Sequence, residues 1–299
     1  MALVYFDKFR ERTGVDNFGD DINPVLMGKF INKSILSSDE IALFGIGTIL
    51  NDTNIRQNDH FARKVIFSSG VGYGKLETKL DETWDIACVR GPRSAKALGL
   101  GLDKAIADGA ILLSEIYNKP VQQSARGVFI PHVNSHLSTG RLLAAIADNL
   151  DMDYLSPSCN ADEFIHTVAG APFVVTEAMH GAILADTMRV PWLPVSLHEY
   201  HEFKWFDWME SVGLNGQTVH PLSPKCWDEE EGNRPGLSLR SLYKSIKGHF
   251  LQRRIGQIIA TSEPLLSQPN VLEMKKDALL NVVSDINGTY SNFHGRRAS

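Results

Sequence analysis

Short apolar runs rich in Val, Ile and Phe alternate with stretches of helical periodicity along most of the chain. Such an alternation is typical of parallel sheets that are wrapped by helices. The runs of the first half predict strands at residues 2–6, 41–46, 65–69, 86–89 and 105–107. Those of the second half predict strands at residues 128–131, 153–155, 173–176 and 192–195. The pattern therefore predicts an α/β fold with two doubly wound sheets.

Some of the intervening helices have recognisable starts. Asn23 followed by Pro24 combines a cap with a proline at the first helical position, and Gly91 followed by Pro92 repeats this arrangement. Ser135 precedes a long stretch of helical pattern and is the predicted start of another helix.

The length of 299 residues suits two domains better than one. Segment 117–126 is polar, contains a proline and separates the two sets of strands, so we predict a linker there. A second change in composition comes near residues 221–235, beyond which the sequence is helical without obvious strands. We therefore predict two Rossmann-like domains that face a cleft and a C-terminal helical extension with a tail, over residues 1–122, 123–225 and 226–299 respectively.

Charge and cysteine content exclude several classes of protein. With 30 Lys and Arg against 35 Asp and Glu, the formal net charge of −5 gives no general field for nucleic acid. Cys88, Cys159 and Cys226 form no CxxC pair, which indicates reduced thiols. The apolar run that ends at Phe6 is too short for a signal peptide, and no later run approaches the roughly 18 residues of a membrane span. We therefore expect a cytoplasmic protein.

Ligands of an open parallel sheet bind beyond the carboxyl ends of the strands, which directs attention to the loops there. The loop after the first predicted strand reads NFGDDINP and leads into a helix whose free N–H groups suit an anion. Asn17 is a candidate for substrate binding and Asp20 for catalysis. Asp21 is equally well explained as an acidic residue that the helix dipole favours.

Two glycine-rich loops follow the next strands. Gly47 lies in GIGT and Gly70 in SSGVGYGK, and both glycines allow the backbone to approach a ligand closely. Neither loop has the GxGxxG spacing with an acid about 20 residues later, and the second lacks the Ser or Thr of a Walker A loop. Gly47 and Gly70 are therefore candidates for substrate contact, whereas NAD or P-loop ATP binding is only weakly indicated.

Two arginines follow the fourth strand in the sequence VRGPRS. Arg90 stands at the strand tip and Arg93 in the first helical turn, where a guanidinium beside a helix N-terminus suits phosphate or carboxylate. We predict that both bind substrate, with a surface salt bridge as the alternative. Asp108, after the fifth strand, is as well explained by capping a helix as by contact with a substrate.

In the second half, candidate acid–base residues lie after two predicted strands. His132 follows the first of these strands, and Glu177 and His180 follow the strand at 173–176. We expect Glu177 and His180 to share one helix face, because they are three residues apart. The helix N-terminus would keep the histidine neutral and stabilise the carboxylate, which suits proton transfer. A capping or core role is the alternative for both histidines.

Residues 197–202, LHEYHE, gather histidines and acids once more. No Cys and no second HxxxH accompanies them, so we predict no metal site and no cofactor. The aromatic stretch at 203–209 has helical spacing, which is more typical of core or domain packing than of a binding platform. Lys204 within it remains a candidate for substrate binding.

The chain resembles the polysaccharide pyruvyl transferase family, and most closely its bacterial exopolysaccharide ketal-pyruvylating members. The resemblance covers roughly residues 1–212 and rests on NFGDDINP, GIGTIL, VRGPRS, DGAILL, IPH and TEAMHGAILADTMRVP, in the family's order. It implies a fold like that of the GT-B glycosyltransferases. It also implies a transferase that moves the enolpyruvyl unit of phosphoenolpyruvate to a sugar of an exopolysaccharide repeat unit, where a pyruvate ketal forms and phosphate leaves.

The resemblance implies roles for the candidate residues. His180 and Glu177 would transfer protons, while Asp20 and His132 would serve the acceptor or support the site. Many family members carry an arginine two positions before the histidine, in an RLHG-like motif, whereas this chain has Ala178 there. Arg90, Arg93 or Lys204 would then have to hold the phosphoenolpyruvate.

The implied acceptor is a lipid-linked oligosaccharide or a polysaccharide. Residues 242–255 mix bulky apolar residues with basic ones, as in helices that lie on anionic membranes, so we consider a peripheral contact with the cytoplasmic face of the inner membrane. A solvated helix that packs on the core is the alternative. Two other functions remain open: a GT-B-type glycosyltransferase that uses a nucleotide sugar, and a non-catalytic protein that binds polysaccharide or assembly partners.

Overall fold

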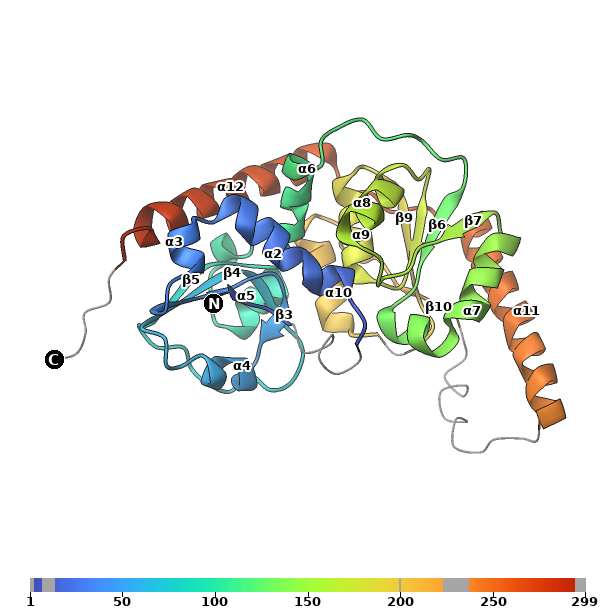
Figure 1. The fold of residues 1–299 in the computed structure, drawn as a ribbon, viewed down its shortest axis with the longest axis horizontal. Helices are drawn as coiled ribbons and strands as arrows, with labels where there is room; N and C mark the ends of the chain where they lie inside the picture. Colours follow the sequence, from blue (N-terminus) through green and yellow to red (C-terminus); the bar gives the residue numbers. More distant parts are fainter. Residues whose placement is uncertain (1–2, 7–13, 199, 223–236, 294–299) are drawn as a thin grey trace. The chain divides into compact units, whose positions relative to one another are not determined.

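The computed structural model describes residues 3–6, 14–198, 200–222 and 237–293, and of 237–245 the backbone alone (Figure 1). The chain divides into two compact units. Unit 1 comprises Met1–Asn118, His201–Gln217 and Ser267–Ser299. Unit 2 comprises Lys119–Tyr200 and Thr218–Leu266. The predicted second domain differs from unit 2, since residues 201–217 pack with unit 1.

Unit 1 is built on a parallel sheet in which β4 is the central strand. Its strands are β1 (Leu3–Val4), β2 (Ile41–Phe44), β3 (Gly47–Leu50), β4 (Arg63–Val71) and β5 (Trp84–Val89). β4 pairs with β2, β3 and β5, and β2 pairs with β1. The sequence missed β3, which begins at a glycine. It wrongly predicted a strand at 105–107, where Ala105 makes a single bridge to Val89.

The helices of unit 1 come from three separate parts of the chain. They are α2 (Phe18–Phe30), α3 (Lys33–Leu36), α4 (Asp52–Gln57), α5 (Pro92–Ala97), η1 (Leu102–Lys104), η2 (Gly109–Leu112), α6 (Leu113–Ile116), α10 (Glu202–Ser211) and α12 (Pro269–Tyr290). α12 is anchored by Tyr290, whose hydroxyl donates to Asp85 Oδ2 at 2.6 Å, and by Asn287, whose amide donates to the Phe30 carbonyl at 2.8 Å. The final helix therefore belongs with the first strands.

Helix α2 begins at Phe18 with Asn17 as its cap, so the prediction of a start at Asn23 and Pro24 is wrong. Pro24 lies inside the helix and cannot donate to the carbonyl of Asp20, four residues earlier. The side-chain amide of Asn23 donates to that carbonyl at 3.1 Å instead. The NP pair is thus tolerated within the helix because the asparagine replaces the missing backbone donor. The prediction for Pro92 is confirmed, since α5 begins there with Gly91 as its cap.

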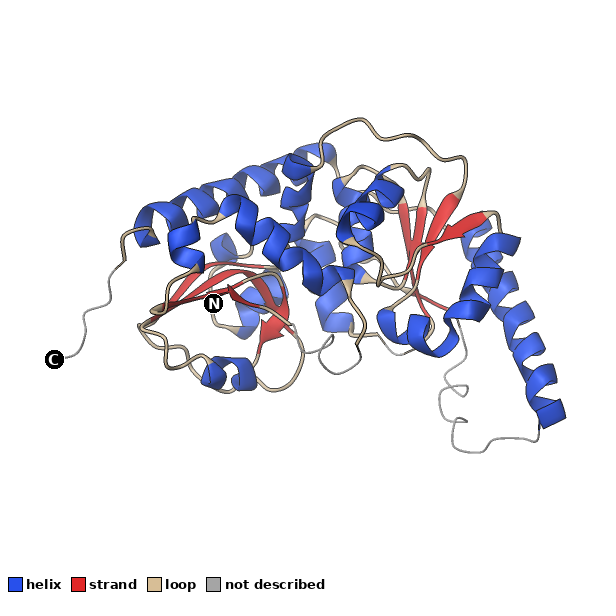
Figure 2. Cartoon of the chain, viewed as in Figure 1, coloured by secondary structure: helices blue, strands red, loops and turns tan. Residues whose placement is uncertain are grey.

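Unit 2 contains a second parallel sheet, whose strands are drawn in red in Figure 2. Its strand order is β10-β9-β8-β6-β7. Its strands are β6 (Gly127–Ile130), β7 (Met152–Tyr154), β8 (Val174–Thr176), β9 (Trp192–Ser196) and β10 (His220–Pro221). In chain order the first strand lies between the second and the third, as in flavodoxin-like sheets. The direction of winding therefore reverses between β6 and β8, and such a switch point is where these sheets bind ligands. The short β10 was not predicted.

The helices of unit 2 are α7 (Val133–Asn149), α8 (Ala161–Ala169), α9 (Met179–Thr187) and α11 (Leu237–Thr261). One apolar core joins Phe129, Val175 and Leu193 of the sheet to residues of α7 and α11 such as Leu143 and Leu251. α7 starts at Val133 with His132 as its cap, so the predicted start at Ser135 is wrong. The expected C-terminal extension is also divided, because α11 belongs to unit 2 and α12 to unit 1.

Among the described residues, no helix combines the length and the apolar character that crossing a membrane requires. Cys88 is a buried free thiol and Cys159 a half-buried one, and burial raises the pKa of Cys88 to about 12. Cys226 and the terminal residues 294–299 lie outside the described part of the chain.

Candidate functional site

Glu177 occupies the switch point of unit 2. It follows β8, and its two carboxylate oxygens accept backbone N–H groups from the loops after two other strands. Oε1 accepts from Leu197, after β9, at 2.6 Å, and Oε2 accepts from His132, after β6, at 3.2 Å. Glu177 is 7% exposed. One buried carboxylate therefore links the ends of β6, β8 and β9 where the sheet changes its direction of winding.

Burial raises the pKa of the Glu177 carboxyl above its ordinary value. Hydrogen bonds from the Leu197 and His132 N–H groups lower the pKa, as do the nearby Ser135 and His198 side chains. Because burial is the largest of these effects, Glu177 takes up a proton more readily than an exposed glutamate does. Such a group is better suited to general acid chemistry than an exposed glutamate is.

His180 stands in the first turn of α9 and is half-buried. Ala178 is the N-cap with extended backbone angles, so Glu177 lies before the helix. The expectation that Glu177 and His180 share a helix face is therefore wrong. Thr176 fixes the turn, since its hydroxyl oxygen accepts the Ala178 N–H at 2.9 Å. A Cβ at Gly181 would lie 2.8 Å from that oxygen, which explains why a glycine follows the histidine.

His132 caps α7. Its ring nitrogen Nδ1 accepts the N–H of Asn134 at 3.2 Å, while its own backbone N–H binds Glu177. The capping alternative for His132 thus describes its contacts in the structure, and contact with a substrate stays a prediction.

Three polar residues that the sequence did not single out lie at the same edge of the unit 2 sheet. His136 lies in α7, Tyr154 ends β7, and Ser156 follows it. The Tyr154 hydroxyl is 2.7 Å from His136 Nδ1, and Ser156 Oγ is 3.3 Å from His136 Nε2. His136 lies four residues after the N-cap of a helix that starts at a strand end, a position that could have marked it as a candidate.

In unit 1, the two acids of the NFGDDINP segment lie in the first turn of α2, and Asn17 is its cap. The Asn17 side-chain amide donates to Asp20 Oδ2 at 2.6 Å, and the Asn17 backbone N–H donates to Asp21 Oδ2 at 2.8 Å. Asp21 thus satisfies the backbone N–H of the cap residue. The Asn23 side chain also accepts the N–H of Ile46 at 2.9 Å, which ties α2 to the loop after β2. A catalytic role of Asp20 stays a prediction.

Gly47 and Gly70, which the sequence marked as candidates for substrate contact, are both explained by the local backbone structure. Gly47 is the first residue of β3 and has φ of +115°, a conformation that favours glycine. A Cβ at Gly70 would lie 2.2 Å from Cζ of Arg90, so the guanidinium lies directly against the glycine backbone. The absence of a side chain at Gly70 thus makes room for Arg90.

Arg90 is fully buried at the end of β5. Its Nε donates to Asp207 Oδ2 at 3.0 Å, Nη1 to the Thr48 hydroxyl at 2.7 Å, and Nη2 to the Val71 carbonyl at 3.0 Å. Each guanidinium nitrogen therefore has a partner within unit 1. Contact of Arg90 with a substrate stays a prediction, and the burial of the side chain does not favour it.

The rest of the VRGPRS segment also binds α10. The backbone N–H of Ser94 donates to Asp207 Oδ1 at 2.9 Å, and a Cβ at Gly91 would lie 1.9 Å from the Asp207 carbonyl oxygen. Arg93 forms a bidentate ion pair with Glu210, with a shortest distance of 2.6 Å. The segment thus holds a helix that lies more than 100 residues later in the chain.

The start of α10 carries a group of aromatic and basic residues. The Lys204 ammonium lies 5.7 Å from the centre of the Tyr73 ring, which packs edge-on against His201 at 4.8 Å between ring centres. Burial lowers the pKa of His201, and the positive charges of Lys204 and Arg90 add to that effect. Lys204 is half-buried and has no ion pair among the residues that the structure describes.

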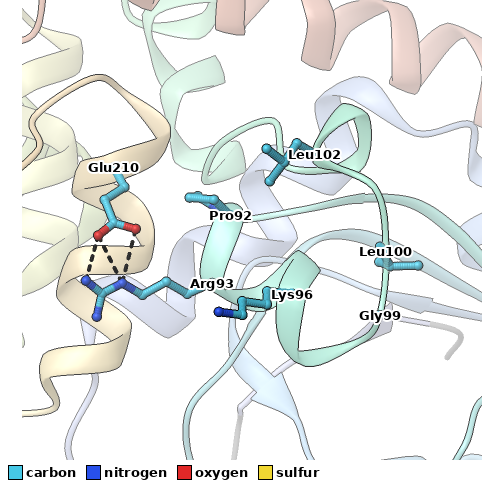
Figure 3. Close-up of a pocket in the computed structure, with 7 residues that line it drawn as sticks. All are labelled: Pro92, Arg93, Lys96, Gly99, Leu100, Leu102 and Glu210. Atoms are coloured by element: carbon cyan, nitrogen blue, oxygen red, sulfur yellow. Dashed lines mark hydrogen bonds and ion pairs between the residues drawn. The ribbon is translucent and has the colours of Figure 1, made fainter.

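A pocket of about 570 Å³ is lined by residues of α5 and of the segment that follows it, together with Glu210 of α10 (Figure 3). Its lining includes the Arg93–Glu210 ion pair and Lys96. The remaining lining residues are Pro92, Gly99, Leu100 and Leu102. Of the predicted site residues, the pocket includes Arg93 alone.

No group of three or more His, Cys, Asp or Glu side chains within the described ranges could hold a metal ion. Glu199 of the LHEYHE segment lies outside those ranges.

Comparison with known proteins gives two findings. The model of the family described as polysaccharide pyruvyl transferase matches residues 4–199. The succinoglycan biosynthesis protein ExoV of Rhizobium meliloti (strain 1021) is 36% identical over 204 residues, which are 66% of this chain and 62% of ExoV. The match thus spans less than two thirds of the length of that relative.

Proposed function

The chain belongs to the polysaccharide pyruvyl transferase family, and from this we propose that it transfers the enolpyruvyl unit of phosphoenolpyruvate to a sugar of an exopolysaccharide repeat unit. A pyruvate ketal forms and phosphate leaves. The family match over residues 4–199 carries the proposal, and the similarity to a succinoglycan biosynthesis protein supports an exopolysaccharide acceptor. The GT-B-like arrangement of two Rossmann-like domains is part of the proposal and rests on the resemblance.

The reaction needs an acid, a base and cations. The acid protonates the methylene carbon C3 of phosphoenolpyruvate, and C2 becomes electrophilic. A sugar hydroxyl then bonds to C2 as a base takes its proton. A second hydroxyl of the same sugar bonds to C2 and displaces phosphate, which closes the cyclic ketal. Each well-placed contact to the developing charge contributes about 3 kcal/mol.

We assign the acid step to unit 2. Glu177 has the raised pKa that suits a proton donor, and His180 follows it at the start of α9. His180 is the better placed of the two to contact a substrate, because it is half-buried whereas Glu177 is 7% exposed. In this assignment His180 donates the proton to phosphoenolpyruvate. Glu177 keeps the strand ends in place and influences the protonation of the groups around it.

For the anion we favour Lys204 among the predicted cations. Arg90 is buried against Asp207 and Arg93 is paired with Glu210. Lys204 has no such pair within the described residues and faces an aromatic ring, so its ammonium is the one that can bind a phosphate without first breaking an ion pair. Lys204 thus takes the role that the missing arginine at position 178 leaves open.

A lipid-linked acceptor would make contact with a membrane useful, and α11 suits one. Its sequence carries basic residues and no acidic one. Ile246 is 57% exposed and Phe250 41%, while Leu251 and Ile255 on the other side are buried. Basic helices with exposed bulky apolar residues bind anionic membrane surfaces. We therefore propose a peripheral contact at the cytoplasmic face of the inner membrane.

Flotation with anionic vesicles tests this contact. We expect the protein to float, and the double variant Ile246→Glu, Phe250→Glu to remain at the bottom of the gradient. Leu102→Glu, at a residue of unit 1 that is 71% exposed, is the matched control. Equal flotation of both variants would contradict the contact.

Ligand-dependent melting and product analysis test the activity. Phosphoenolpyruvate at 100 times its Kd would stabilise the protein by about 2.7 kcal/mol, and a nucleoside diphosphate would not. Incubation with phosphoenolpyruvate and lipid-linked glycans should add one pyruvylidene unit by mass spectrometry. Stabilisation by a nucleoside diphosphate alone would favour a glycosyltransferase, and stabilisation by neither would favour a binding protein.

A further inference from the structure

His136, Tyr154 and Ser156 form a hydrogen-bonded chain at the carboxyl edge of the unit 2 sheet. The Tyr154 hydroxyl lies 2.7 Å from Nδ1 of His136, and the Ser156 hydroxyl lies 3.3 Å from Nε2. The two rings are nearly parallel, with centres 6.0 Å apart and an interplanar angle of 27°. Both nitrogens of His136 are thus engaged, one with each hydroxyl.

The order of donors and acceptors allows His136 to take up a proton. The backbone N–H of Ser158 already donates to Ser156 Oγ at 3.1 Å, so the Ser156 hydroxyl can donate its own proton to Nε2. Nδ1 then carries the ring hydrogen and donates to the Tyr154 oxygen. A serine, a histidine base and a third group that orients the histidine are the parts of an assembly for proton removal.

Burial sets the protonation of His136 and Tyr154. It lowers the pKa of His136 and raises that of Tyr154 to about 12. At neutral pH the imidazole is therefore neutral and able to accept a proton, while the tyrosine keeps its own. The charge of Glu177 also acts on Tyr154, so the three residues belong to the same edge as the buried carboxylate.

The backbone around the three residues is fitted closely to them. A Cβ at Gly140 would lie 3.1 Å from the Tyr154 hydroxyl and 3.2 Å from His136 Nδ1. Gly140 thus leaves room for the contact between the two side chains, although it lies in the middle of a helix where glycine is unfavourable.

We propose that His136, acting through Ser156, is the base that removes the proton of the acceptor sugar, and that Tyr154 is a positioning residue. This inference rests on the proposed pyruvyl transfer. The sugar proton passes to Ser156 Oγ while the serine proton passes to Nε2 of His136, and the sugar oxygen bonds to C2 of phosphoenolpyruvate. The C2–C3 π electrons form the new C–H bond at C3.

The second half of the reaction completes the balance. The second sugar hydroxyl bonds to C2, and the C2–O bond to phosphate breaks with its electron pair on the phosphate. Of the two hydroxyl protons lost, one is matched by the proton gained at C3 and the other by the proton gained by the departing phosphate. No oxidant, reductant or further reactant is required.

The test compares three variants of the full chain, His136→Gln, Ser156→Ala and Tyr154→Phe, by phosphate release and pyruvylidene transfer. General base catalysis is worth about 10²–10⁴ in rate, so His136→Gln should lower kcat at least about 100-fold with the KM for phosphoenolpyruvate unchanged. Ser156→Ala should act in the same direction. Tyr154→Phe removes the partner of Nδ1–H, so the acidic limb of the pH profile should move to lower pH.

His166→Gln is the matched control. His166 is a histidine of α8 whose ring binds the Asp162 carbonyl at 2.7 Å, and it should keep the wild-type rate. Melting curves, and retained stabilisation by phosphoenolpyruvate, verify folding of each variant. If His136→Gln does not fold, the smaller change Ser156→Ala decides the matter.

Failure of the base assignment can be distinguished from failure of the proposed function. An active wild-type protein whose His136→Gln and Ser156→Ala variants keep its kcat and its pH profile would overturn the base assignment and leave pyruvyl transfer standing. A wild-type protein that is neither stabilised by phosphoenolpyruvate nor able to form the ketal would overturn the proposed function, and this assignment with it.

Discussion

The guanidinium of Arg90 and the carboxylate of Asp207 form an ion pair at 3.0 Å in which neither side chain is exposed to solvent. The two residues are 117 positions apart, and the pair joins the end of β5 to α10. Because the Ser94 N–H and hydroxyl also bind Asp207, both carboxylate oxygens are hydrogen-bonded. The VRGPRS segment, which carries both arginines, therefore stabilises the fold of unit 1.

Removal of one partner of this pair should be costly. Arg90→Ala leaves a buried carboxylate without its counter-charge, and we expect a loss of about 3–5 kcal/mol in the free energy of unfolding. Urea denaturation followed by tryptophan fluorescence measures it, with Trp208 of α10 as a reporter. Arg93→Ala is the control, because that pair is partly exposed and should cost about 1 kcal/mol or less. Equal losses in the two variants would contradict the structural role of Arg90.

A methyl group at Gly70 should act on the same pair. Gly70→Ala would place Cβ 2.2 Å from Arg90 Cζ, so the guanidinium or the strand must move, at a cost of about 1–3 kcal/mol. Gly28→Ala makes the same chemical change at an exposed position of α2 with nothing within 4 Å, and it should stabilise the protein by about 0.5–1 kcal/mol. Thermal melting of both variants would refute the steric argument if their shifts had the same sign.

Glu177 should make stability depend on pH. Its pKa is raised in the folded state above the ordinary value of 4.5, so the folded protein holds this proton more tightly than the unfolded chain does. The stabilisation is therefore complete below the unfolded pKa and is lost as the pH rises through the folded pKa. Glu177→Gln cannot ionise and lacks this dependence.

The measurement is the difference in unfolding free energy between wild type and Glu177→Gln, taken from acidic to neutral pH. We expect the wild type to lose stability relative to the variant over that interval. A constant difference would show that the Glu177 pKa is not raised. An increase would show that the hydrogen bonds from Leu197 and His132 outweigh burial.

His180 and Lys204 should affect different kinetic constants. His180→Ala should lower kcat at least about 100-fold, since a proton transfer is lost, with little change in melting temperature. Lys204→Gln should chiefly raise the KM for phosphoenolpyruvate, because it removes a charge that binds the anion. Initial rates with varied phosphoenolpyruvate separate the two effects. Wild-type kinetics in both variants would remove these assignments.

The sequence predicted a strand or helix correctly where one continuous segment is enough to define it. The apolar runs predicted β2, β4 and β5 of unit 1 and most strands of unit 2 to within a few residues. β3 and β10 were missed because they are short and one begins with glycine. The start of α2 was misplaced because a proline inside a helix resembles a proline at its beginning, unless the Asn23 amide is known to replace the missing donor.

In the candidate site, too, the sequence indicated single segments but not the contacts between distant residues. The sequence placed His132, Glu177 and Arg90 at strand ends, where the structure also has them, but it did not indicate what each residue contacts. Glu177 faces two backbone N–H groups, from residues 45 positions before it and 20 after it. His136 and Tyr154 were overlooked, because a helix residue and a strand end 18 positions apart have no local pattern that joins them.

The sequence by itself determined the α/β class, the alternation of strands and helices and the family, since these depend on hydrophobic periodicity and on short contiguous motifs. Only the tertiary structure decided that Arg90 binds Asp207, that Glu177 spans a switch point, and that α10 and α12 join the first strands. The physical reason is that a buried charge selects its partner by distance in the folded chain. That distance is set by the packing of whole elements and not by the residues on either side.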